Sequence, residues 1–176
     1  KMRSNLENAA DDSSSILLDI IDLETSEDET ERSLAASASL VDGTFINIIT
    51  TIYDLVASTE QSKYDLIIKE LDYMVSEASS KLDHIGRQGS GIVSSSVLED
   101  LTAESAKVFK LLKGSGSIIE LKQQQLNHEF AAAKQLIDTQ SEAKDVNKKM
   151  TVLAKAIDTF ASDISTTALE IIDSAA

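Results

Sequence analysis

The chain has 176 residues, a formal net charge of −14, and neither cysteine nor proline. This length suffices for a single domain over residues 1–176, with a core that needs no metal or crosslink. The acidic charge opposes contact with nucleic-acid phosphates, so no nucleic-acid partner is expected. Without cysteine, disulfides and thiolate chemistry are excluded.

Helix-forming residues dominate the composition, and helix breakers are scarce: there are only six glycines and no proline. The seven aromatic residues are few for this length, so the core must consist mainly of aliphatic and alanine contacts. Together with sustained apolar spacing of four and three residues, this predicts an all-α protein. The expected architecture is an elongated antiparallel up-down bundle of five or six amphipathic helices with coiled-coil-like packing.

Six Ser/Thr-x-x-Glu/Gln capping boxes indicate where the helices start. They are Ser4/Glu7, Ser26/Glu29, Ser58/Gln61, Ser96/Glu99, Ser117/Glu120 and Thr139/Glu142. With the apolar spacing, the boxes predict helices over about 5–23, 27–57, 59–85, 97–113 and 118–138, followed by a sixth. Gly43 either ends a helix or bends it, and the sequence leaves that choice open.

Two of these helices have strict seams of alternating four- and three-residue steps. The 64–85 seam consists of Tyr64, Ile68, Leu71, Val75, Ala78, Leu82 and Ile85. The C-terminal seam consists of Val146, Met150, Leu153, Ile157, Phe160, Ile164, the polar Thr167, and Ile171. Between 118 and 173 there is no glycine or proline, so only the Thr139 box argues for a turn there. A break is the favoured prediction, and a single helix of roughly 84 Å is the alternative.

The sequence indicates no reaction. His84 and His128 lack the Glu-x-x-His spacing of a bundle metal centre, because Lys81 and Gln125 stand three residues before them. Solvent-facing histidines are therefore expected. The serine clusters lack a nucleophile elbow, and the two Gly-Ser-Gly stretches lack the lysine of a phosphate loop. We expect no enzyme activity, no cofactor and no metal.

The apolar seams carry the functional predictions. The simplest interpretation is that every seam faces one shared core. Gly/Ser hinges at 86–91 and 114–116 and a core poor in rings suggest that the helices can separate around an apolar ligand or on a lipid surface. In composition the chain is similar to the exchangeable apolipophorins of insects, which implies such a lipid-handling bundle. The expected apolar interior is lined by Ile68, Leu71, Val75, Leu101, Val108, Phe130, Met150, Leu153, Ile157, Phe160 and Ile164.

The alternative function is a protein-interaction or structural module. Helices 64–85 and 146–171 would then pair with each other, with a partner helix, or in a homo-oligomer.

The sequence gives little information about the cellular compartment. The opening KMRSNLENAADD has no apolar stretch after its basic residues and is not expected to be a signal peptide. No segment is expected to span a membrane, because SSSILLDIIDL is interrupted by Asp19 and Asp22. The compartment is not fixed, with secretion slightly favoured over the cytoplasm.

Overall fold

The structure, a computed structural model, describes residues 1–175, and these contain helices but no β-strand. The all-α prediction is confirmed. The helices are α1 (Met2–Ile21), the short 3-10 helix η1 (Asp22–Thr25), α2 (Glu29–Ala57), α3 (Gln61–Gln88), α4 (Ser95–Leu112) and α5 (Ile118–Ala175).

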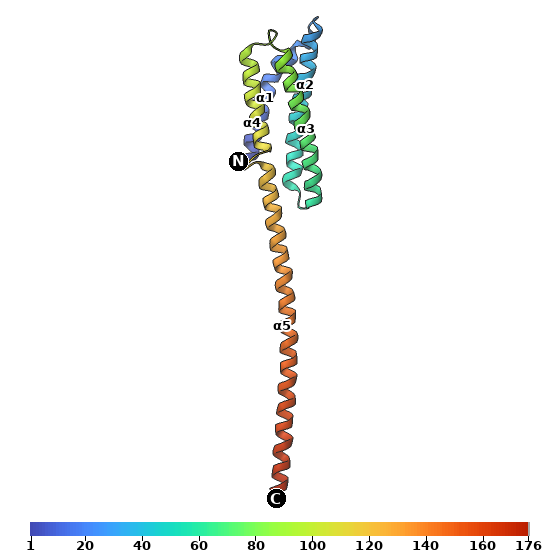
Figure 1. Cartoon of the computed structure of the whole chain (residues 1–176), viewed down its shortest axis with the longest axis vertical. Helices are drawn as coiled ribbons and strands as arrows, with labels where there is room; N and C mark the ends of the chain where they lie inside the picture. Colours follow the sequence, from blue (N-terminus) through green and yellow to red (C-terminus); the bar gives the residue numbers. More distant parts are fainter. Residues whose placement is uncertain (176) are drawn as a thin grey trace. The chain divides into compact units, whose positions relative to one another are not determined.

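Contacts divide the chain into two units, one of residues 1–127 and one that begins at His128. The first unit is a helical bundle in which α1 contacts α2 and α4, and α2 contacts α3 (Figure 1). Contacts between α3 and α4 are sparse. The second unit is the part of α5 that follows Asn127.

The core of the first unit is centred on α2. Its buried apolar residues follow one another at steps of four and three, as Leu34, Ala38, Val41, Phe45, Ile48, Ile52 and Leu55. Phe45 meets Phe109 of α4 edge to face, with ring centroids 6.0 Å apart. All residues of the 64–85 seam are buried or half-buried, so that seam faces this core.

Helix α2 continues through Gly43. A Cβ atom added at Gly43 would meet nothing within 4 Å, so the glycine is not required for close packing. The glycine costs the helix some stability but does not end it, since flanking residues on both sides supply buried side chains.

Most predicted helix starts are displaced from the capping boxes. Asp28, not Ser26, caps α2, and its Oδ1 accepts from the backbone N–H of Thr30 at 2.7 Å. Ser94, not Ser96, caps α4. Ser58 lies at the C-terminal end of α2, where its hydroxyl donates to the Leu55 carbonyl. At α2 and α4 a competing polar side chain two residues from the predicted cap made the box pattern ambiguous.

The Ser117/Glu120 box does operate at the start of α5. The Glu120 N–H donates to Ser117 Oγ at 3.3 Å, and the Glu120 carboxylate accepts from the N–H of Gly116. Further along, Lys122 donates from Nζ to the Val56 carbonyl at 2.9 Å, and Leu126 is fully buried. These contacts attach the first turns of α5 to the first unit.

The predicted break at Thr139 is wrong, because α5 is one helix of 58 residues. Thr139 lies inside it and donates its hydroxyl to the Gln135 carbonyl, 2.8 Å away. A threonine can make this bond to the preceding turn in mid-helix as readily as it can cap a helix. With no glycine or proline nearby, nothing ends the helix there.

We expect Gly43→Ala to raise the free energy of unfolding by about 0.5–1 kcal/mol, because alanine loses less backbone entropy in a helix than glycine. Urea unfolding followed by circular dichroism measures this. Gly91→Ala is the matched control and should destabilise the protein, because Gly91 has φ +87°. A loss of stability in Gly43→Ala would contradict the packing described for α2.

The cap of α2 makes stability depend on pH. The backbone N–H groups of Glu31 and Thr30 hold the pKa of Asp28 below the ordinary value of 3.8. Ionised Asp28 therefore contributes stability above about pH 4 that is lost as pH falls through its lowered pKa. In thermal scans at pH 5 we expect wild type to have a higher melting temperature than Asp28→Asn. Near pH 2 the two melting temperatures should be equal. An unchanged difference across this range would contradict the cap.

Candidate functional site

The structure places the eleven predicted interior residues in two different environments. Five belong to the first unit: Leu71, Leu101 and Val108 are buried, and Ile68 and Val75 pack half-buried against the same core. They come together as ordinary core residues of α3 and α4. Their side chains fill the bundle.

The other six predicted residues lie on α5 in the second unit and are exposed. Their exposed fractions run from 54% to 67%, for Phe130, Met150, Leu153, Ile157, Phe160 and Ile164. These six residues are therefore not part of the buried core of the first unit. An amphipathic pattern requires that a helix have a covered face, but it does not say which surface covers it.

The C-terminal seam forms one continuous apolar face on α5. Its apolar members recur at steps of four and three from Val146 to Ile164, with Thr167 as the polar interruption before Ile171. Alanines flank it at 154, 156, 161 and 168. A shallow groove runs along it between Phe160 and Ile171. On other faces of the helix, Thr151, Thr159 and Thr166 donate their hydroxyls to carbonyls of the preceding turn.

A second, shorter apolar stripe precedes the C-terminal seam on the same helix. This 126–137 stripe consists of Leu126, Phe130, Ala133 and Ile137. Ile137 and Val146 are nine residues apart, which is about two and a half turns at 3.6 residues per turn. The two stripes therefore lie on opposite sides of α5. One continuous helix therefore presents apolar residues on two of its sides.

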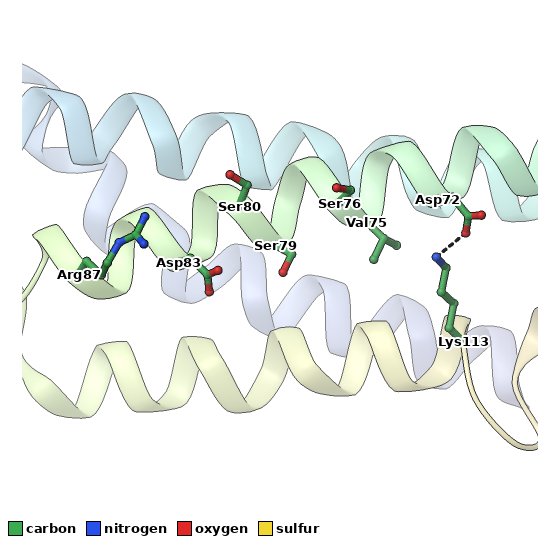
Figure 2. Close-up of a pocket in the computed structure, with 8 residues that line it drawn as sticks. All are labelled: Asp72, Val75, Ser76, Ser79, Ser80, Asp83, Arg87 and Lys113. Atoms are coloured by element: carbon green, nitrogen blue, oxygen red, sulfur yellow. Dashed lines mark ion pairs between the residues drawn. The ribbon is translucent and has the colours of Figure 1, made fainter.

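A polar groove lies along the side where α3 and α4 make few contacts (Figure 2). Asp72 forms an ion pair with Lys113 at one end. The remainder is lined by serine hydroxyls, Asp83 and Arg87. No histidine or cysteine is among the residues that line this groove. The groove has mixed charge and no apolar floor suited to an acyl chain.

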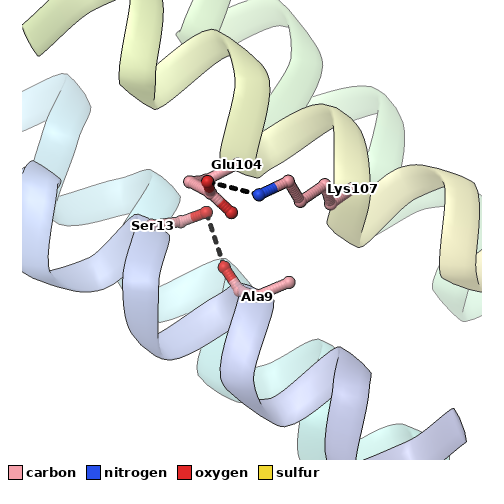
Figure 3. A network of polar contacts seen from close by, with 4 residues as sticks. All are labelled: Ala9, Ser13, Glu104 and Lys107. Carbon is pink, nitrogen blue, oxygen red and sulfur yellow. Dashed lines mark hydrogen bonds and ion pairs between the residues drawn. The ribbon is translucent and has the colours of Figure 1, made fainter.

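A small group of polar side chains lies where α1 and α4 pack together (Figure 3). Glu104 pairs with Lys107 at 2.5 Å, and Ser13 donates its hydroxyl to the Ala9 carbonyl at 2.8 Å. Within residues 1–175, Glu104 Oε2 and Ser105 Oγ are buried without a hydrogen-bond partner. Small side chains on this face allow the two helices to approach closely, at the cost of incomplete hydrogen bonding. The cluster belongs to helix packing.

Residues 1–175 contain no group of three or more His, Asp or Glu side chains that could hold a metal ion. In the same part of the chain, α2 alone is long and apolar enough to cross a membrane, which the sequence prediction overlooked. One side of α2 forms the core of the bundle. A central helix of a folded domain can have the same length and apolar composition as a membrane-spanning helix.

Comparison with protein-family models, curated proteins and solved structures finds no match to this chain. Among the surfaces described above, the C-terminal seam is a continuous apolar face with seven exposed apolar residues.

We expect Leu71→Ala to lower the unfolding free energy of the first unit by about 2–5 kcal/mol, because it leaves a cavity in the core. Leu153→Ala should change it by no more than about 0.5 kcal/mol. All three tyrosines lie within residues 1–127, so tyrosine fluorescence during urea unfolding reports this unit. Equal losses in both variants would mean that the C-terminal seam packs onto the first unit.

Proposed function

We propose that this protein is a non-enzymatic assembly module in which the C-terminal seam of α5 pairs with another helix. The observation that carries the proposal is the exposure, by more than half, of every apolar residue in a regular seam from Val146 to Ile171. A seam of this regularity is typical of coiled-coil pairing. Large apolar patches on soluble proteins commonly mark interaction sites.

The energetics favour a covered seam. Most of the stability of a helix in a protein comes from packing its apolar face, and a helix without that packing is only marginally stable in water. Full burial of a valine, leucine, isoleucine, phenylalanine or methionine is worth roughly 1.5–3 kcal/mol. With more than half of each side chain still exposed, most of this gain remains available to a partner.

The predicted antiparallel up-down bundle with coiled-coil packing belongs to the same proposal. The four- and three-residue steps of buried residues in α2 and of the 64–85 seam in α3 support left-handed packing between these helices. Connections as short as residues 58–60 support antiparallel neighbours. In this proposal the first unit is a closed bundle, and α5 supplies the interaction surface.

Binding to a lipid surface is the second candidate function, and the same exposed face supports it. Four lysines at 144, 148, 149 and 155 lie near the start of the C-terminal seam, where they could meet anionic headgroups. The part of α5 beyond residue 155 has no basic residue, which weakens the attraction to an anionic surface. The closed core of the first unit argues for a surface contact rather than an internal carrier site.

The experiment compares Ile157→Asp with Val152→Asp in the full chain. Val152 is 68% exposed on the same helix but lies off the seam, so both variants place one aspartate on an exposed turn of α5. We expect wild type and Val152→Asp to self-associate, or to bind a partner helix, in sedimentation velocity runs over a concentration series. Ile157→Asp should lose this association, because a charge in the seam is costly to bury.

Two results would contradict helix pairing. One is equal association of both variants. The other is a monomeric wild type that floats with phosphatidylcholine–phosphatidylserine vesicles while Ile157→Asp does not, which would favour the lipid surface.

A further inference from the structure

The charges along the C-terminal seam are unevenly distributed, and this distribution indicates which partner fits the seam. Residues 144–155 contain four lysines and one aspartate, a net charge of +3. Residues 156–176 contain four acidic and no basic residues, a net charge of −4. From this division, and resting on the proposed function, we infer that the occupant of the seam is a second copy of α5, aligned antiparallel.

An antiparallel pair brings the basic half of each helix beside the acidic half of the other. A parallel, in-register pair would instead bring the two basic halves together and the two acidic halves together, so each half would be repelled by its own copy. The two orientations bury the same apolar residues, so charge decides between them. Both charged halves belong to the same described helix up to residue 175.

The seam also fixes the register. When Ile157 of one copy lies opposite Phe160 of the other, Leu153 faces Ile164 and Met150 faces Thr167 of the second copy. Val146 then faces Ile171, and all eight seam positions are covered. A shift by one heptad in either direction leaves seam positions of both helices without a seam partner, so the aligned register buries the most apolar surface.

This register gives the flanking charges partners. Lys149, Ala156, Asp163 and Glu170 immediately precede seam positions 150, 157, 164 and 171 and so form one flank of the seam. In an antiparallel pair this flank of one helix lies beside the same flank of the second helix. Lys149 then lies at the level of residue 168 of the second copy, about 3 Å along the axis from Glu170 and about 7.5 Å from Asp163. In a parallel pair the flank meets Asn147 and the alanines at 154, 161 and 168, which offer no charge.

The phenylalanine and threonine positions support the same alignment. A parallel pair would place the bulky Phe160 against its own copy and Thr167 against Thr167. The antiparallel register puts Phe160 opposite Ile157 and the small Thr167 opposite the flexible Met150, so neither Phe160 nor Thr167 faces its own copy.

Cysteine crosslinking tests the orientation without background, since the chain has no cysteine. Met150→Cys and Thr167→Cys are made in separate full-length chains, one carrying a size tag, and are mixed in a glutathione redox buffer. We expect the mixed disulfide to be the main crosslinked product, because these two positions face each other. Each variant alone should crosslink weakly, because two copies of residue 150 lie about 25 Å apart in this register.

Charge exchange tests the flank. Lys149→Glu should raise the dissociation constant about 3- to 10-fold, because two symmetric exposed contacts are reversed. Adding Asp163→Lys and Glu170→Lys to this variant should restore association. Lys148→Glu is the matched control: Lys148 is on the solvent side and lies 4.0 Å from Asp145 of its own helix, so the variant should behave as wild type.

The outcomes separate the two proposals. Strong self-crosslinking of Met150→Cys would overturn the antiparallel alignment and leave helix pairing intact. A wild-type chain that stays monomeric over the whole concentration series would overturn the second copy as partner. Both proposals would be overturned if Ile157→Asp associated as strongly as wild type and the mixed disulfide were not the main crosslinked product.

Discussion

Covering an apolar helix face is the constraint on which this structure depends. Helices α1 to α4 meet it by covering one another: α2 lies between α1 and α3 and buries a regular row of residues from Leu34 to Leu55. The first turns of α5 join this arrangement through Leu126 and the hydrogen bond from Lys122 to Val56. The apolar residues of the C-terminal seam are exposed instead, although they recur at the same steps of four and three, with Thr167 as the polar position.

The continuity of α5 changes what its pattern means. Two separate helices could each have turned an apolar stripe toward one bundle. One continuous helix cannot, because the stripe ending at Ile137 and the seam starting at Val146 lie on opposite sides of it. Surfaces on two sides of one helix suit contacts with different neighbours. The C-terminal seam has a basic half and an acidic half, and this division of charge favours a neighbour with the opposite order of charges.

Much of the fold could be predicted from sequence, because helix content and inward faces follow from composition and spacing. The seam of α3 was identified residue by residue, from Tyr64 to Ile85, and the structure buries or half-buries all of it. Helix ends were predicted less well: Asp28 and Ser94 compete with nearby serines as caps. The environment of Leu153, Ile157 and Phe160 could not be predicted, because periodicity indicates a face to be buried but not the surface that buries it.

Amide hydrogen exchange of residues 146–171 in the full chain, as a function of protein concentration, tests the central claim most directly. If the C-terminal seam pairs with a second copy, these amides exchange slowly at high concentration, and their protection falls on dilution while that of α2 stays constant. Exchange of residues 146–171 that is equally fast at every concentration would contradict the account.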